Sequence, residues 1–461
     1  MKIKQKMVRI LTGILTMILV LSSITFVSAV DKEEEIDKLI EAQARAVEAN
    51  EVLMQYFFVE GCGIVYPDYF AGRYIEDNTF HIRLAAPTDE ELAGLKNLLS
   101  GYEDVVVYEY GDFSRTFLQN YADEIASELK EQGVAVANWG VDDKTGDVNI
   151  GVLSEDIHIA KEMIEIAQTY SPRSGSPKIV IEEGGYVSTI SHSTSEMSEE
   201  ENVVFDIEKI DAGRRILVGD DNSIRSVGIC GYYNGRMALV TCGHGGTNIG
   251  DDVVAYHDPI GTVVDVQYED GEEGDYSIVE LNDRGELIFS HKISTRMEEY
   301  GVITGGTVLS PAIGTTIKRY GCKSGYSSGT VIDVGITGLA ESGRHIHGLT
   351  KVSITDGAEA IDGDSGGPVL SGKAFCGIVN SKDTQTPNII YFTPYSIISA
   401  SGFTAVAQHD CSNWTNANGS FHSGYCGICD ETVYEAHSEY WNHLFGRCTR
   451  CGRTGQVPFD P

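Results

Sequence analysis

Apolar positions recur at helical spacing in the first third of the chain. Between Lys32 and Tyr56 the apolar residues fall three or four positions apart, as one face of an amphipathic helix requires. The same spacing predicts helices over 89–99, 117–132 and 157–170. Runs of apolar residues, some strictly alternating with polar ones, predict strands over 80–84, 147–152 and 178–182. Residues 30–185 are therefore predicted to form an α+β unit.

A different pattern begins near Ile216 and continues to about residue 407. Short apolar runs recur between glycines, and no long amphipathic helix interrupts them. The runs span 237–241, 263–268, 277–281, 329–334, 375–379 and 389–392. Short strands at such intervals are typical of an all-β sandwich or barrel. Residues 216–407 are therefore predicted to be a second unit, made only of strands.

Two segments lack apolar periodicity. Ser, Thr and Glu dominate much of 186–215, which is predicted to be a linker and a candidate activation region. Residues 408–461 form a small tail rich in Cys and His. A chain of 461 residues is too long for one ordinary core, which agrees with two larger units, a linker and a tail.

The N-terminus has the pattern of an export signal. Basic residues precede an apolar run over 10–26, and a small-x-small site follows, with cleavage expected after Ala29. Residues 1–29 are therefore predicted to be a signal peptide, and the mature protein to be secreted. The apolar run is slightly long, so an uncleaved membrane anchor is the alternative. The net charge of −34 argues against nucleic acid as a partner.

Three residues suggest acyl-transfer chemistry. Ser365 lies in the motif GDSGGP, whose glycines allow a tight turn and bring N–H groups beside the hydroxyl. His244 ends the motif TCGH, and Asp275 directly precedes an apolar strand. We predict that Ser365 is the nucleophile, His244 its base and Asp275 the group that orients the base. The N–H groups of Gly363 and Ser365 are predicted to form the oxyanion hole.

Other histidines and aspartates compete for these roles. None of the competing histidines follows a Thr-Cys-Gly strand end, and Asp275 is favoured because the strand behind it could bury its carboxylate. The competing residues are His257, His291, His345, His347, Asp251, Asp252 and Asp265.

At these motifs the chain resembles the chymotrypsin-like serine proteases, most closely the bacterial branch of streptogrisins and alpha-lytic protease. The order His, Asp, Ser is that of the family. Residues 321–331 resemble the segment that opens the second barrel of that branch, and 391–394 resemble its strand near the C-terminus. The resemblance implies two six-stranded antiparallel barrels with the active site between them.

The resemblance extends more weakly to the N-terminal unit. Residues 70–74 and 139–142 are similar to propeptide segments of that branch, which implies a propeptide acting as a folding aid or intramolecular inhibitor. An independent α/β domain of other function is the alternative. Arg215–Ile216 is a candidate activation bond, whose new N-terminus would pair with Asp364 as in animal relatives. In the bacterial branch an internal arginine can do that work instead, and the sequence leaves both open.

The chain also departs from the family. Cys242 stands where the family has alanine, and Gly245 where it has cysteine. We hypothesise disulfides between Cys230 and Cys242 and between Cys322 and Cys376.

The resemblance places three residues at the specificity pocket. Glu359, six residues before Ser365, would lie at its floor and favour Lys or Arg substrates. Asn380 and Lys382 would lie on its wall, where Lys382 could neutralise Glu359 or block the pocket.

The tail carries two CxxC pairs, the spacing of zinc knuckles. We predict a structural zinc site of the zinc-ribbon type and no cofactor for catalysis; two disulfides are the alternative. The four residues are Cys426, Cys429, Cys448 and Cys451.

The sequence therefore predicts a secreted serine endopeptidase made as a zymogen, which cleaves proteins or peptides through an acyl-enzyme intermediate. A catalytically inactive relative that binds peptides or cell-surface ligands is the first alternative. An esterase with the same triad is the second, although no pattern of alternating parallel strands and helices supports an α/β-hydrolase.

Overall fold

The computed structural model describes residues 34–170, 176–189, 210–219, 223–255, 257–295, 299–303, 306–405 and short strands within 411–448. Within these residues no helix is both long and apolar enough to cross a bilayer. The predicted signal peptide lies outside them.

The N-terminal unit begins with a helix over residues 34–57, whose buried face includes Ala46, Ala49 and Leu53. Beside it lies a three-stranded sheet with α2 between its second and third strands in sequence. In α2 the Thr88 side chain caps the helix reciprocally with Glu91, which satisfies N–H groups at the start of the helix. The elements are β1 (Phe58–Val59), β2 (Gly63–Ile64), β3 (Phe70–Glu76), β4 (Thr79–Ala85), α2 (Asp89–Leu98) and β5 (Val106–Gly111).

The second half of this unit is a three-stranded sheet with its own core. Strands β6 and β7 are antiparallel, and β8 joins β7 in parallel. Helix α3 packs on the sheet through Leu118, Ala126 and Leu129. The elements are α3 (Arg115–Glu131), β6 (Val136–Val141), β7 (Val148–Val152), α4 (Ile157–Tyr170) and β8 (Ile179–Glu183). The helices and strands predicted from apolar spacing are confirmed to within a few residues.

The first part of the all-β unit is an eight-stranded sheet in the order β12-β11-β15-β16-β18-β14-β13-β27. This sheet differs from the six-stranded barrel expected from the sequence. Strands β12 and β27 extend it to eight strands, and no pairing between described strands closes it. Its strands are β11 (Arg215–Val218), β12 (Ser223–Ser226), β13 (Ile229–Tyr233), β14 (Arg236–Thr241), β15 (Asp252–Ala255), β16 (Asp258–Gln267), β18 (Tyr276–Leu281) and β27 (Thr404–Ala405). Beside it lie α5 (Asp283–Ile288) and a small sheet of β10 (Ile210–Ala212), β19 (Phe289–Ser294) and β20 (Glu299–Val302).

The second part is a closed six-stranded barrel, as expected. Its antiparallel pairings run β22-β23-β26-β25-β24-β21 and return to β22. Val331, Val352 and Phe392 are among the side chains that fill it. The strands are β21 (Thr316–Gly321), β22 (Gly325–Leu339), β23 (His345–Gly357), β24 (Pro368–Ser371), β25 (Ala374–Asp383) and β26 (Ile389–Pro394), with β17 (Glu272–Glu273) added to β23 and α6 (Tyr395–Ala400) following β26.

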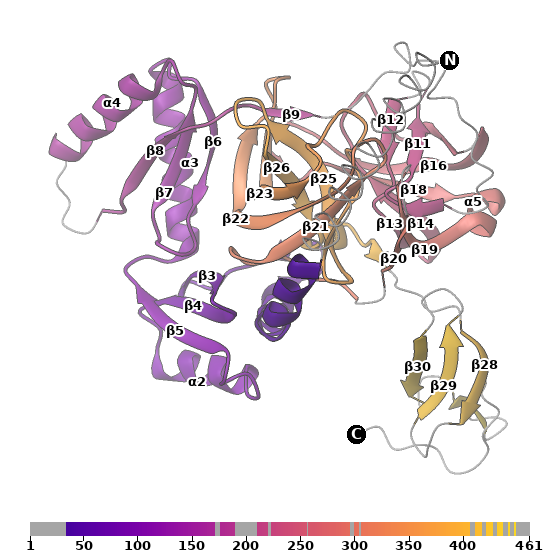
Figure 1. Ribbon diagram of the computed structural model, residues 1–461. Helices are drawn as coiled ribbons and strands as arrows, with labels where there is room; N and C mark the ends of the chain where they lie inside the picture. Colours follow the sequence, from indigo (N-terminus) through magenta and orange to yellow (C-terminus); the bar gives the residue numbers. More distant parts are fainter. Residues whose placement is uncertain are drawn as a thin grey trace, which may run out of the picture.

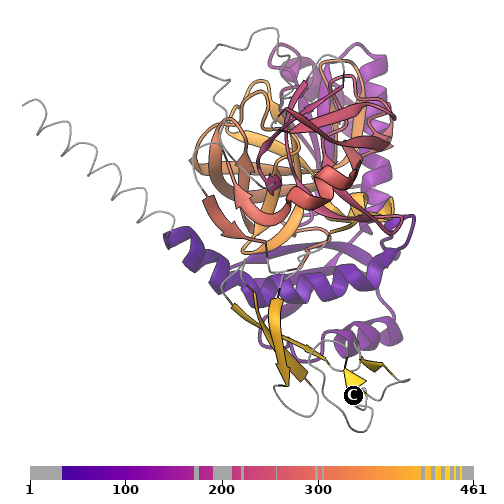
Figure 2. The ribbon, with the colours of Figure 1, turned by 90° about the vertical axis from the view of Figure 1, so that its right-hand side faces the viewer.

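The N-terminal unit extends this barrel at two places. Strand β6 pairs with β22, so that its three-stranded sheet continues the barrel wall (Figure 1). Strand β9 (Val187–Thr189) pairs antiparallel with the end of β25. Seen from the side, the helix over 34–57 runs beneath the barrels (Figure 2). The segment 186–215, predicted to be a linker, is not a linker at its two ends. There β9, β10 and the start of β11 are strands, and each pairs with a neighbouring strand.

A buried ion pair lies at the junction between the two units. Arg115 Nε donates to Asp143 Oδ1 at 2.9 Å, and its Nη2 donates to the Val334 carbonyl in β22 at 2.8 Å. The side chains of Arg115 and Asp143 are 6% and 0% exposed. The Asp143 carboxylate also accepts from the N–H of Arg73 at 3.4 Å. Burial makes this contact sensitive to the loss of either partner.

The tail contributes a three-stranded antiparallel sheet and a two-stranded one. The strands are β28 (Cys411–Asn416), β29 (Phe421–Cys426), β30 (Glu431–Ala436), β31 (Trp441–Asn442) and β32 (Arg447–Cys448). The predicted zinc ligands lie outside the described residues or have side chains that the structure does not describe, so the zinc site stays a prediction.

Arg115→Met should strongly destabilise the junction, because it leaves the Asp143 carboxylate buried beside a side chain with no charge. We expect a loss of about 3–5 kcal/mol in the free energy of unfolding, measured by urea denaturation of the full chain. The matched control is Lys144→Met, which removes an exposed ion pair with Glu76 and should change little. Equal effects of the two substitutions would contradict the importance of the buried pair.

Candidate active site

His244 and Asp275 form a buried pair in the first part of the all-β unit. His244 follows the end of β14 and Asp275 precedes β18, and the pairing of Thr241 with Ser277 brings these strand ends together. His244 Nδ1 and Asp275 Oδ2 are 2.5 Å apart. The other carboxylate oxygen accepts from the N–H groups of Gly243 and His244 at 2.7 and 2.9 Å. The carboxylate is therefore fixed at the edge of the imidazole.

The electrostatics of this pair favour a charged imidazole. Burial lowers the pKa of His244, but the Asp275 carboxylate outweighs it and holds that pKa above its ordinary value. Burial likewise opposes the charged form of Asp275, and the imidazole together with the two N–H groups lowers its pKa. An imidazole that accepts a proton here is therefore stabilised by its neighbour.

The turn that carries Ser365 depends on its glycines. Gly363 has φ +103° and Gly366 has φ +85°, in the region that only glycine adopts easily. A Cβ at Gly366 would also lie 2.1 Å from Thr241 Oγ1, and one at Gly321 would lie 2.2 Å from Asp364 Oδ1. The nucleophile turn can therefore approach the strand end before His244 closely.

The carboxylate of Asp364, beside the nucleophile, is fully buried and anchored from the second barrel. It accepts from Arg319 Nη1 at 3.3 Å and from Ser324 Oγ at 2.5 Å. The N–H groups of Lys323, Ser324 and Ile361 donate to it at 3.0 Å each. In this structure the cation beside Asp364 is therefore an internal arginine, as one of the two alternatives expected.

The candidate activation bond Arg215–Ile216 lies within β11. Ile216 pairs with Arg225 and is 1% exposed. Cleavage at this bond stays a prediction; in the uncleaved chain the cation that contacts Asp364 is Arg319.

Ser226 joins the two parts of the all-β unit at the nucleophile turn. Its N–H donates to the Ser365 carbonyl at 2.8 Å, and its hydroxyl donates to the Gly363 carbonyl at 2.9 Å. Its own carbonyl accepts from Thr241 Oγ1 at 2.8 Å. This residue therefore links the strand end before His244 to the turn of Ser365.

The hydroxyl of Ser365 is hydrogen-bonded to the main chain and not to the imidazole. It donates to the main-chain carbonyl of Asn380 at 2.7 Å. His244 Nε2 is buried and has no hydrogen-bond partner among the described residues. The N–H groups of Gly363 and Ser365 likewise make no hydrogen bond within the described part of the chain. Among the described residues, the imidazole nitrogen of His244 and the N–H groups of Gly363 and Ser365 thus have no hydrogen-bond partner.

Of the three predicted pocket residues, Lys382 and Glu359 lie beside each other, whereas the Asn380 side chain has other partners. Lys382 Nζ lies 3.7 Å from Glu359 Oε1, so the lysine neutralises the glutamate. Asn380 does not line a pocket wall with its side chain: it is fully buried, and its Nδ2 donates to the Asp275 carbonyl at 2.7 Å. Its assignment to the specificity pocket is therefore corrected.

The two predicted disulfides are wrong. All four cysteines are buried, and none of them forms a disulfide. Cys230 packs in the core of the first part and Cys376 in the core of the closed barrel, while Cys322 Sγ donates to the Gly363 carbonyl at 3.2 Å. Burial raises the pKa of Cys322 to about 12, so this thiol stays protonated.

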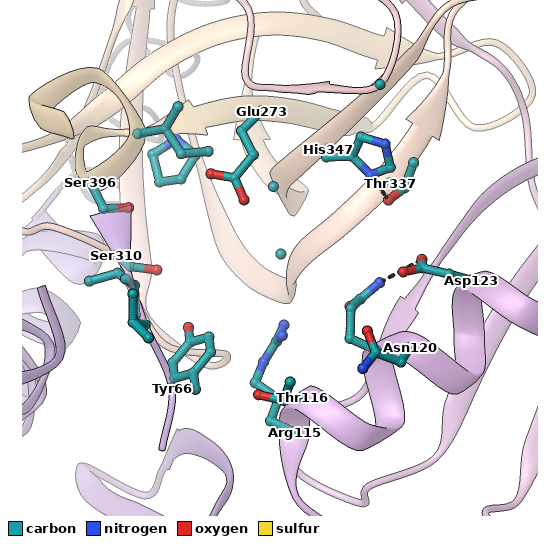
Figure 3. A pocket seen from close by; sticks show the side chains of 18 residues that line it. Tyr66, Arg115, Thr116, Asn120, Asp123, Glu273, Ser310, Thr337, His347 and Ser396 are labelled. Carbon is teal, nitrogen blue, oxygen red and sulfur yellow. Dashed lines mark hydrogen bonds between the residues drawn. The ribbon is translucent and has the colours of Figure 1, made fainter. Parts of the chain in front are cut away.

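A cavity of about 570 Å³ lies between the N-terminal unit and the closed barrel. Arg115 and Tyr66 reach it from the N-terminal unit, and Glu273 and His347 from the opposite side (Figure 3). Burial raises the pKa of Glu273 and lowers that of His347, so both charges are disfavoured. Because both units line it, the cavity exists only while they are docked, and it does not include Ser365.

Some residues of the site were missed in the sequence. Arg319 and Ser226 carry no motif of their own, and each acts on a residue far away in the chain. Thr393 lies within the segment 391–394 that resembles the family, yet no role was assigned to it. Its hydroxyl accepts from the Asp275 N–H at 2.9 Å.

No protein-family model and no curated protein matches the chain. Solved structures do. Thermobifida fusca protease A is 24% identical with a TM-score of 0.37, and Cellulomonas bogoriensis chymotrypsin is 22% identical with a TM-score of 0.36. Each match covers 43% of this chain and 100% of the other chain. The alpha-lytic protease homolog N4 is 18% identical over 42% of this chain and 98% of its own, with a TM-score of 0.35.

These are bacterial chymotrypsin-like serine proteases. The resemblance to this family is confirmed, whereas the resemblance of residues 70–74 and 139–142 to propeptide segments stays a prediction.

Asp275→Asn should lower the pKa of His244, because it removes the carboxylate that raises it while burial still disfavours the charged ring. The measurement is an NMR titration of the His244 ring in a Ser365→Ala background. Asp265→Asn is the control, since Asp265 contacts Tyr233 rather than His244. An unchanged midpoint in Asp275→Asn would show that another group sets the charge of the imidazole.

Proposed function

We propose that this chain is a serine endopeptidase that acts through an acyl-enzyme. Ser365 Oγ attacks the substrate carbonyl, and His244 takes its proton and later gives it to the leaving amine. Asp275 holds the imidazole and stabilises its charged form. The N–H groups of Gly363 and Ser365 receive the oxyanion, each contributing about 3–4 kcal/mol in comparable sites. The observation that carries the proposal is the buried His244–Asp275 pair, linked through Ser226 to the turn of Ser365.

Attack requires one local rotation. Turning the Ser365 side chain about its Cα–Cβ bond moves its hydroxyl from the Asn380 carbonyl toward His244 Nε2, which has no partner among the described residues. The backbone of the turn stays where Ser226 and Asp364 hold it. In the proposed catalytic arrangement the Ser365 hydroxyl donates to His244 Nε2 instead of the Asn380 carbonyl.

We propose further that the described state is that of a zymogen, with the N-terminal unit as its propeptide. Strand β9 lies on Ser381, Lys382 and Asp383, directly after Asn380. Strand addition to an exposed sheet edge is a general way to bind an extended peptide. A substrate that needs this edge would compete with β9, so the chain would inhibit itself until the strand leaves.

The remaining features belong to the same proposal. The signal peptide over 1–29 would direct secretion, and the four tail cysteines would hold a structural zinc ion. The ion pair between Lys382 and Glu359 argues against a simple preference for Lys or Arg beside the cleaved bond, since the acidic group is already neutralised.

Ser365→Ala should abolish labelling by a fluorophosphonate probe and reduce peptide hydrolysis about 10⁴-fold or more, because the nucleophile is lost. The control is Ser371→Ala, a serine in β24 outside the proposed site. Labelling of wild type that persists in Ser365→Ala would contradict the proposed nucleophile. No labelling of the wild-type chain after release of the N-terminal unit would favour the inactive, peptide-binding alternative, and ester hydrolysis without peptide hydrolysis would favour the esterase.

Ser188→Pro should release the inhibition, because proline lacks an N–H and disfavours strand pairing. The full-length chain should then react faster with the fluorophosphonate probe. Ser188→Ala keeps the backbone donor and is the matched control. Equal rates for wild type and both variants would mean that β9 does not obstruct the site.

A further inference from the structure

Asn380 occupies an irregular position in β25. The register of β25 against β26 shifts between Val379 and Ser381, so that Asn380 is the extra residue of a β-bulge. Bulges re-aim side chains, and this one places both the side chain and the carbonyl of Asn380 in the protein interior. The carbonyl accepts from Ser365 Oγ, and the side chain is directed at Asp275.

Three hydrogen bonds form a closed ring around the backbone of Asp275. Asp275 N–H donates to Thr393 Oγ1 at 2.9 Å, Thr393 Oγ1 donates to Asn380 Oδ1 at 2.9 Å, and Asn380 Nδ2 donates to the Asp275 carbonyl at 2.7 Å. A threonine hydroxyl has one proton, and the Asp275 carbonyl lies farther from it, at 3.3 Å. The ring therefore fixes the donor and acceptor ends of the Asn380 carboxamide.

The ring crosses from one part of the all-β unit to the other. Asp275 lies beside β18 in the first sheet, whereas Asn380 and Thr393 belong to β25 and β26 of the closed barrel. All three residues are 0% exposed, so water cannot replace a lost partner. The carboxylate of Asp275 is held by its own sheet, through Gly243 and His244, and its backbone is held by the barrel.

We propose that Asn380 and Thr393 are positioning residues that fix Asp275, and through it His244, against the barrel that carries Ser365. The inference rests on the proposed protease function. Neither side chain contacts the imidazole, so both act through the placement of Asp275. The side chain of Asn380 thus positions the His244–Asp275 pair, and its main-chain carbonyl accepts from the hydroxyl of the nucleophile. In this proposal the carboxamide does not select the substrate.

The test compares Asn380→Leu, which keeps the approximate shape of the side chain, with Thr393→Val, which removes the hydroxyl. Each leaves buried polar groups unpaired, so we expect kcat to fall about 10- to 100-fold while KM changes less than about threefold. Thr393→Ser should restore activity because it keeps the hydroxyl. Thr350→Val is the matched control, since the buried Thr350 hydroxyl in the same barrel has no partner among the described residues.

A second measurement does not depend on turnover. In a Ser365→Ala background, Asn380→Leu and Thr393→Val should move the NMR titration of His244 to lower pH, and Thr393→Ser should not. The double variant Asn380→Leu/Thr393→Val should lose less activity than the product of the single losses, because both break one ring.

Several outcomes would overturn the inference. Unchanged kcat and an unchanged His244 titration in folded Asn380→Leu and Thr393→Val would refute it. A rise in KM alone would return Asn380 to substrate selection. A wild-type chain without Ser365-dependent activity would refute the proposed function instead, and the titration of His244 would still decide whether the ring positions Asp275.

Discussion

The buried carboxylate of Asp364 is the constraint on which the candidate site depends. A fully buried charge is costly unless its oxygens are satisfied, and here five donors from three chain segments converge on it. Those donors fix the residue beside Ser365, and Ser226 fixes the carbonyls on either side of Asp364. The Gly366 N–H adds a further contact by donating to the Val379 carbonyl at 2.7 Å. The orientation of the turn toward His244 follows from the same contacts.

The N-terminal unit and the closed barrel meet through main-chain pairing and through a buried ion pair. Strand β6 extends the barrel at β22, and Arg115 joins Asp143 to the Val334 carbonyl close to that pairing. Strand β9 makes a second, separate pairing with β25. The second pairing begins at Ser381, next to Asn380, whose carbonyl accepts from the Ser365 hydroxyl. The ion-paired contact with the barrel and the proposed obstruction of the site thus involve different strands of the N-terminal unit.

Local patterns predicted most of the elements and the nucleophile turn, because apolar spacing and glycine chemistry act over a few residues. Contacts between distant segments could not be predicted in this way. Arg319 and Asp364 are joined only in the folded barrel, and the bulge that turns Asn380 inward depends on pairing with β26. The disulfide hypothesis failed for the same reason: nearness to a motif in sequence does not place two thiols in one core.

Four buried cysteines of the all-β unit form no disulfide, and this affects how the chain responds to a reductant. Cys230, Cys242, Cys322 and Cys376 lie in packed interiors without a covalent partner. Within the described residues the all-β unit is thus held by strand pairing, buried apolar surface and ionic anchors, and these four thiols add no cross-link. A reductant would therefore break no bond at these four positions, whose thiols are shielded from solvent by the packed side chains around them.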